Sequence, residues 1–222
     1  MTPLAKFNAI IISITTFFMY GLWLAINKVI EIETIPFFIT TILSALVSLG
    51  FYRSMSGILK KIFMNNKFVK KFVLGNYYLE GTWVGFFIGN NGRVRFLCEN
   101  FEQDLDGIVI QGSSYTDCKK IHGSWIAKNP VIDIKEKRIT YYYEADMIKN
   151  LFINPGLASF KMDKINKSFY INRLNGFSSD IYNPNKLFAV EEKISESFIF
   201  DVNFILQHAQ EVYEKNKNII PE

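Results

Sequence analysis

The sequence predicts a membrane-anchored all-β protein, with two N-terminal transmembrane helices followed by an eight-stranded antiparallel up-and-down β-barrel and a C-terminal helix. Two observations lead to this fold class. The first 52 residues carry two long apolar runs that contain no charged side chain. From Tyr77 onward, clusters of Gly, Asn, Asp and Ser recur about every 8 to 12 residues between runs rich in β-branched and aromatic residues, which is typical of a β-sandwich or barrel.

The first apolar run, Phe7–Ile26, has 20 residues, and the second, Ile35–Tyr52, has 18. Spanning the hydrocarbon core of a bilayer takes about 20 predominantly apolar residues, so we expect residues 1–52 to form a transmembrane hairpin. The first run is longer than the apolar part of a typical signal peptide, and a second run follows it directly, which disfavours cleavage. Neither run holds an acid, a Lys, an Arg or a His, which argues against a transporter.

A stripe of small and hydroxyl residues follows one face of each predicted helix. Ser13 and Thr16 lie on the first helix, and Ser44 and Ser48 lie on the second. Such stripes let helices approach closely and hydrogen-bond across the contact. They are expected either to pack the hairpin together or, in addition, to drive the assembly of protomers in the membrane.

Positive charge is concentrated after the second run. Residues 1–52 have no net charge, residues 53–71 hold six basic residues and no acid, and the rest of the chain sums to −2, because the total is +4. Residues 53–74 are expected to be a basic juxtamembrane linker that lies on the anionic inner leaflet or is simply solvated. The positive-inside rule then puts both termini in the cytoplasm. The mildly acidic remainder lacks the field that binding to a nucleic-acid polymer requires.

Residues 75–222 are expected to form a cytosolic β-barrel with a terminal helix. Antiparallel strands without long helices between them close most simply into a barrel, which removes exposed edges. Apolar residues at helical spacing predict the terminal helix over Ile194–Lys215. Turns are predicted at Asn90-Asn91-Gly92, Lys135-Glu136-Lys137 and Asn175-Gly176. The eight predicted strands are Tyr78–Ile88, Val94–Gln103, Gly107–Ser114, Ile121–Ala127, Val131–Ile134, Arg138–Ala145, Leu157–Met162 and Ser168–Leu174.

The sequence contains no pattern typical of catalysis. The two histidines, His122 and His208, lie near no Cys or second His at the spacing of zinc ligands. No nucleophile-elbow, zinc-protease or phosphate-loop motif is present. Cys98 and Cys118 are expected to be ordinary thiols. We therefore expect a binding protein rather than an enzyme, with no metal and no cofactor.

Aromatic and arginine side chains on the strands are the candidate ligand contacts. The interior of an eight-stranded barrel can hold one small ligand. Aromatic faces stack on nucleobases, and arginine offers paired donors to phosphate. Core packing and solvation remain the alternative for each residue. The candidate ligand-binding residues are Tyr78, Arg93, Arg95, Tyr115, Trp125, Arg138, Tyr142, Tyr170 and Asn172.

The segment Leu79–Gly85 opens the first predicted strand with the sequence L-E-G-T-W-V-G. Its G-x-W is similar to the lipocalin fingerprint, in which the Trp closes one end of the barrel and a late arginine covers its ring. Trp83 and Arg173 are accordingly expected to form a structural pair by cation–π contact.

The whole chain resembles the two-helix, β-strand-rich effectors of bacterial cyclic-oligonucleotide-based anti-phage signalling systems (CBASS), through its order of elements and Leu79–Gly85. The resemblance implies a lipocalin-like barrel that binds a cyclic dinucleotide made by a partner nucleotidyltransferase. It implies oligomerisation through the membrane helices, disruption of the inner membrane and death of the infected cell. It also implies a multi-pass protein of the bacterial inner membrane whose partners are the cyclic dinucleotide, the lipid bilayer and further copies of the chain.

A second function from a different class is a membrane-tethered, lipocalin-like carrier of an apolar ligand. It predicts a lumen lined by aliphatic side chains, with arginines only at the rim. A third is a membrane scaffold with a filled barrel, which predicts no room for a ligand.

Overall fold

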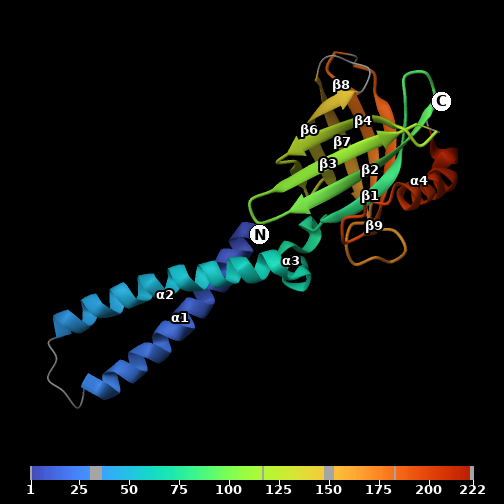
Figure 1. The fold of residues 1–222 in the computed structure, drawn as a ribbon. Helices are drawn as coiled ribbons and strands as arrows, with labels where there is room; N and C mark the ends of the chain where they lie inside the picture. Colours follow the sequence, from blue (N-terminus) through green and yellow to red (C-terminus); the bar gives the residue numbers. More distant parts are fainter. Residues whose placement is uncertain (1, 31–36, 117, 148–152, 183, 221–222) are drawn as a thin grey trace. The chain divides into compact units, whose positions relative to one another are not determined.

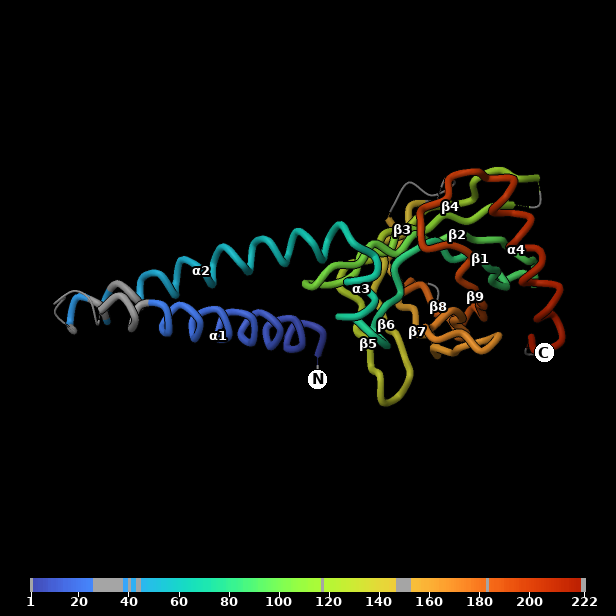
Figure 2. The backbone as a smooth tube through the Cα atoms, turned by 90° about the horizontal axis from the view of Figure 1, so that it is seen from below, coloured from blue at the N-terminus to red at the C-terminus, as the bar shows by residue number. Residues whose placement is uncertain are grey.

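The computed structural model describes residues 2–30, 37–116, 118–147, 153–182 and 184–220. The chain divides into two compact units, Met1–Gly75 and Asn76–Glu222. Figures 1 and 2 show the first unit as helices and the second as a barrel with one long helix beside it.

The first unit is a helical hairpin with a short third helix, formed by α1 (Pro3–Ile30), α2 (Phe37–Asn65) and α3 (Lys67–Leu74). The first two helices run antiparallel, side by side, in both views (Figures 1 and 2). The rings of Phe18 and Phe51 stack between them at 3.7 Å between centroids. The second helix continues well beyond the predicted span, so the first half of the predicted linker is a continuation of that helix.

Membrane anchoring has limited support in this unit. By length and composition, one segment among the described residues, Pro3–Ala25, is apolar enough to cross a bilayer. The second predicted span, Ile35–Tyr52, begins outside the described residues and otherwise lies in α2. Within the ranges that the structure describes there is therefore one candidate span, where the sequence predicts two.

The second unit is an eight-stranded antiparallel barrel. Its strands follow one another in the order β4-β3-β2-β1-β9-β8-β7-β6, and a direct pairing of β4 with β6 closes the sheet on itself. The strands are β1 (Gly81–Ile88), β2 (Val94–Gln103), β3 (Ile108–Tyr115), β4 (Ile121–Lys128), β5 (Val131–Asp133), β6 (Arg138–Met147), β7 (Asn154–Asp163), β8 (Arg173–Asp180) and β9 (Leu187–Ser195).

Strand β5, which the sequence predicts as a separate member of the barrel, continues β4 after a bulge. Both strands pair with β6 along the same edge, with Val131 opposite Thr140 and Ala127 opposite Tyr143. Three residues thus oppose two on β6. Asn129, in the bulge, has φ 53°, a left-handed conformation that Asn tolerates better than most residues.

The last two strands differ from the prediction. The predicted strand Ser168–Leu174 is mostly a connection, which the Asn172 side chain closes by accepting from Ile165 N at 2.8 Å and donating to its carbonyl at 3.2 Å. The predicted turn at Asn175-Gly176 lies inside β8. A Cβ on Gly176 would come within 2.1 Å of the Ser159 carbonyl oxygen, so this glycine serves close strand packing rather than a turn.

Strand β9 is absent from the prediction, because the acidic and basic residues Glu191 to Lys193 interrupt its apolar pattern. The structure also shortens the predicted helix, which begins as α4 at Val202 and ends at Asn216. The Asp201 carboxylate caps it by accepting from the backbone N–H groups of Asn203 and Phe204. The turns predicted at Asn90-Asn91-Gly92 and Lys135-Glu136-Lys137 are confirmed.

Two apolar clusters stabilise the barrel, one on each side of its wall. Helix α4 packs outside β1, β2 and β9, with Ile205, Ala209 and Val212 against Val84 and Val190. The inner cluster fills one end of the lumen. There Trp83, which is 0% exposed, contacts Phe101 and donates from Nε1 to the Leu79 carbonyl at 2.9 Å. This end is therefore closed by the barrel's own side chains.

Candidate functional site

The opposite end of the lumen is hollow. A cavity of about 340 Å³ opens there. The β1–β2 turn, the start of β4, the end of β6 and the start of β9 surround it. Its walls are largely aromatic, with Phe87, Trp125, Tyr141, Tyr143 and Phe160 turned inward. This volume lies at the small end of the usual range for ligand sites, about 300 to 1,000 Å³.

Two pairs of glycine and aromatic residues keep this end open. Gly112 on β3 is the cross-strand partner of Trp125, and Gly156 on β7 is the partner of Tyr143. A Cβ at Gly112 would lie 2.1 Å from the Trp125 ring, and one at Gly156 would lie 2.2 Å from the Tyr143 ring. The rings therefore lie across the glycines, against the barrel wall, and leave the centre free for a ligand.

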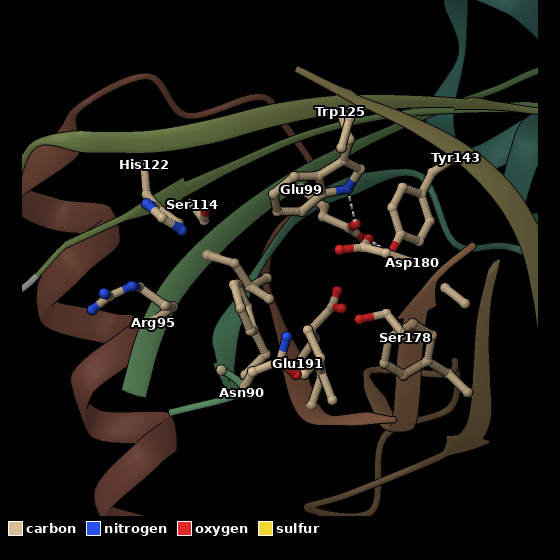
Figure 3. Close-up of a pocket in the computed structure, with 18 of the residues that line it drawn as sticks. Asn90, Arg95, Glu99, Ser114, His122, Trp125, Tyr143, Ser178, Asp180 and Glu191 are labelled. Carbon is tan, nitrogen blue, oxygen red and sulfur yellow. Dashed lines mark hydrogen bonds between the residues drawn. The ribbon is translucent and has the colours of Figure 1, made fainter. Parts of the chain in front are cut away.

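A pair of buried carboxyl groups forms the inner end of the cavity. Glu99 on β2 and Glu191 on β9 are 2% and 1% exposed, and on β1, the strand between them, Gly85 pairs with Glu191 and Trp83 pairs with Glu99. Glu99 accepts from Trp125 Nε1 at 2.6 Å (Figure 3) and from the Tyr141 hydroxyl at 3.2 Å. The two carboxyl groups thus face each other in a site with no bulk water around them.

The pKa values of both carboxyl groups are raised, for partly different reasons. For Glu99 the cause is burial, opposed by the hydrogen bonds from Trp125, Glu191 and Tyr141. For Glu191 burial, the charge of Glu99 and the hydrogen bond with Glu99 all raise the pKa, well above its usual value. Glu191 is therefore the member that keeps the proton, and it donates that proton to Glu99.

A third acidic side chain lies in the same part of the cavity. Asp180, at the end of β8, accepts from the Tyr143 hydroxyl at 2.8 Å. Burial, and then the charge of Asp180 and this hydrogen bond, raise the pKa of Tyr143, so the phenol stays protonated and remains a donor to Asp180. Figure 3 shows Asp180 with Glu99, Tyr143 and Ser178 on one side of the cavity.

Basic groups lie on the other side of the cavity, toward its mouth. Arg95 and His122 lie next to each other there (Figure 3). The Arg95 guanidinium donates to the Val94 carbonyl at 3.3 Å. A guanidinium has five N–H donors, so others remain for a ligand. The cavity is thus acidic inside, aromatic along its walls and basic at its mouth.

Of the nine residues predicted to bind ligand, two line this cavity, namely Arg95 and Trp125. Arg93 is exposed in the β1–β2 turn, and Tyr115 is buried outside the barrel in the cluster under α4. Arg138 and Tyr142 point away from the lumen, since alternation along β6 turns Ile139, Tyr141 and Tyr143 inward. Tyr78, Tyr170 and Asn172 lie at the closed end.

Of the predicted structural pair Trp83 and Arg173, only Trp83 has the predicted role. Trp83 closes the barrel, but Arg173 points outward and donates to the Asn216 side chain at the end of α4. No ring contact joins Trp83 to Arg173 among the residues that the structure describes. At this end two cations lie over aromatic rings among the described residues, Lys193 at 4.3 Å from the Tyr78 centroid and Lys164 at 5.5 Å from the Phe169 centroid.

The predicted assembly residues are in the helical unit. Thr16 and Ser48 line one small groove between α1 and α2. Ser13 donates to the Ala9 carbonyl at 2.8 Å within its own helix. The side chain of Ser44 lies outside the described residues.

Sequence reasoning missed Glu99, Glu191, His122, Tyr143 and Asp180. Alternation along the second strand puts Glu99 on the face of Arg95, so that residue had a usable signal. Glu191 and Asp180 had none, because β9 was not predicted and β8 was misplaced.

A comparison of the chain with models of protein families found no match, and a comparison with curated protein sequences found no similar protein.

Proposed function

We propose that this chain is an anti-phage effector that binds a cyclic dinucleotide in its barrel, oligomerises through its N-terminal helices and disrupts the inner membrane of the infected cell. The observation that carries the proposal is the open, aromatic end of the lumen with Arg95 and His122 at its mouth. A cyclic dinucleotide has two bases that can stack on aromatic rings and two phosphates that a guanidinium can hold.

The arrangement of charge limits how such a ligand is oriented. Its phosphates would be repelled by Glu99 and Asp180 at the inner end and attracted by Arg95 at the mouth. The ligand therefore enters with a base first and keeps its phosphates at the rim. A cyclic dinucleotide that is larger than the cavity can bind in this orientation, because its phosphates stay at the rim.

The helical unit supports the membrane part of the proposal by its exposed apolar side chains. Phe17 on α1 is 82% exposed and Leu49 on α2 is 69% exposed. Large apolar side chains exposed along both helices fit a lipid or protein environment better than water. To shift assembly from 1:99 to 99:1, the ligand must favour the assembled state by about 5.5 kcal/mol.

The alternative, a carrier of an apolar ligand, fits the cavity less well. Arginine does lie only at the rim, as that function predicts. The inner end, however, holds Glu99, Glu191 and Asp180 in place of aliphatic side chains. A fatty acid placed there would leave the buried Glu191 Oε2 without a donor, which costs about 1 to 3 kcal/mol.

Calorimetric and thermal titration of the full chain in lipid nanodiscs tests ligand binding. We expect at least one cyclic dinucleotide to stabilise the barrel, by about 2.7 kcal/mol at a hundredfold excess over Kd, and fatty acids to have no effect. Stabilisation by fatty acids alone favours the carrier. No effect of either class favours a scaffold and contradicts the proposal.

Dye release from vesicles of phosphatidylethanolamine and phosphatidylglycerol tests the output. The ligand is expected to release dye only when the full chain is present. Replacing Thr16 and Ser48 by Leu is expected to abolish release while ligand affinity stays the same. Release that is independent of ligand contradicts the proposed switch.

A further inference from the structure

The inner end of the cavity contains a buried acceptor that the protein leaves without a donor. Glu191 Oε2 has no hydrogen-bond partner among the described residues, although it is fully buried and its side chain lines the cavity. An acceptor in this state costs free energy that a ligand donor can recover. The arrangement therefore points to a ligand group that donates.

The neighbouring donors are already engaged. Trp125 Nε1 and the Tyr141 hydroxyl donate to Glu99, and the Tyr143 hydroxyl donates to Asp180. The proton of the carboxyl pair lies between Glu99 and Glu191. What the inner end presents to a ligand is thus mainly oxygen acceptors.

We propose that Glu191, Glu99 and Asp180 bind the donor edge of one nucleobase, so that the cavity selects a base with adjacent N–H donors, such as guanine, over adenine. Guanine presents a ring N–H and an exocyclic N–H side by side, which suits carboxyl oxygens. Adenine presents a ring nitrogen acceptor beside its amino group, which would face another acceptor.

The walls and the mouth fit the same orientation. The Trp125 and Tyr143 rings come from the paired strands β4 and β6 and line one part of the lumen wall, where a planar base can stack. The cavity of about 340 Å³ is small for a whole cyclic dinucleotide, so one base occupies it. The sugar–phosphate ring then lies at the mouth, near Arg95 and His122 (Figure 3). The inference rests on the proposed function and adds the base that it reads.

The test is a series of three cyclic dinucleotides with one backbone and different bases, titrated against the full chain in nanodiscs. Cyclic di-GMP has both guanine donors, its inosine analogue lacks the exocyclic amino group, and cyclic di-AMP has the opposed ring acceptor. We expect about a tenfold loss of affinity for the inosine analogue, typical of one lost hydrogen bond, and weaker binding still for cyclic di-AMP.

The variant Glu191→Met removes both carboxyl oxygens, and with them the unpartnered acceptor, at a similar side-chain length. It is expected to lower the affinity for cyclic di-GMP about tenfold and to leave that for cyclic di-AMP within twofold. Asp180→Asn provides a second variant if Glu191→Met folds poorly. The matched control is Glu144→Met, because Glu144 is exposed on the outer face of β6, and it should bind like the unmodified chain.

The outcomes separate this inference from the proposed function. Equal affinity for all three ligands, or an unchanged preference in Glu191→Met, overturns the inference and leaves a cyclic-dinucleotide receptor. Binding of none of a full set of cyclic dinucleotides overturns the proposed function itself. The titration of the unmodified chain decides the base preference even if both variants are unstable.

Discussion

The two ends of the barrel lumen are built on the same eight strands but differ in what the inward positions hold. At the closed end these positions carry large apolar side chains, Trp83, Phe101 and Ile110 among them, all 0% exposed. In the hollow half they alternate between aromatic residues and Gly112 or Gly156, and buried acids lie at its inner end. The closed end therefore supplies most of the apolar packing that stabilises the barrel. The open end, with less packing, has room for a ligand.

The largest effect is expected at the closed end. Trp83→Ala removes a fully buried ring and should lower the free energy of unfolding by about 3 to 5 kcal/mol. Phe87→Ala at the mouth is the matched control and should cost less than half as much, because this ring is only partly buried. Thermal unfolding followed by circular dichroism measures both. Equal losses would contradict the division between the two ends.

The carboxyl pair at the inner end gives the next largest effect, as a dependence of stability on pH. In the unfolded chain both groups ionise near a pKa of about 4.3. Burial raises the pKa of Glu99 and Glu191 in the folded state. Above the unfolded pKa the folded state therefore holds a proton that the unfolded state has lost, and stability falls as pH rises toward the folded pKa.

We expect the free energy of unfolding to decrease between about pH 5 and 7, by up to roughly 1.4 kcal/mol per pH unit. Glu191→Gln should remove most of this slope, while Glu144→Gln keeps it. Asp180, Tyr141, Tyr143 and Arg95 also face this part of the lumen, and all four are unchanged in both variants. An unmodified chain that becomes more stable over the same range would show that the pair does not hold its proton.

A smaller effect, on ligand affinity, is expected to distinguish two arginines that the sequence analysis predicts equally as ligand contacts. Arg95 lines the mouth, whereas Arg93 is exposed in the preceding turn. Arg95→Ala should weaken binding of a cyclic dinucleotide about tenfold, or about 1.4 kcal/mol, and leave the melting temperature of the free chain unchanged. Arg93→Ala should change affinity less than twofold. Calorimetric titration compares them, and a stronger effect of Arg93 would place the ligand outside the lumen.

The smallest effect is expected on the outer face of the same wall. Tyr142 is 49% exposed and points away from the lumen, while its neighbour Tyr143 donates to Asp180 inside it. Tyr142→Ala should change stability by about 0.5 kcal/mol or less and leave affinity unaltered. Tyr143→Phe should reduce affinity by releasing Asp180. If Tyr142→Ala alone lowers affinity, the binding surface lies on the outside.

Much of the fold could be predicted from the sequence, because alternation and turn chemistry are local signals. The first four strands and β6 begin and end close to their predicted positions. Strand β8 was misplaced because Asn175-Gly176 resembles a turn, and only the packed sheet shows that Gly176 faces a neighbouring carbonyl. Strand β9 was missed because Glu191, which breaks its apolar pattern, is buried beside Glu99.

The site could be predicted only in part. Trp125 and Arg95 were found because their residue types suit a nucleotide. The remaining lumen residues depend on which face of each strand turns inward and on which strands are neighbours. Glu99 and Glu191 are 92 residues apart in the chain and meet only because β2 and β9 both flank β1. Such a juxtaposition has no counterpart in local sequence patterns.

The chain enters the barrel at its plugged end, where the Gln103 side chain donates to the Tyr77 carbonyl at 2.7 Å and accepts from Leu79 N at 2.8 Å. The cavity opens at the far end, beside the short turn between β1 and β2. Mutations in that turn can accumulate without touching the residues that hold the incoming segment. Under the proposed function, changes in that turn can therefore alter which ligand is bound while the attachment of the barrel to the preceding segment stays the same.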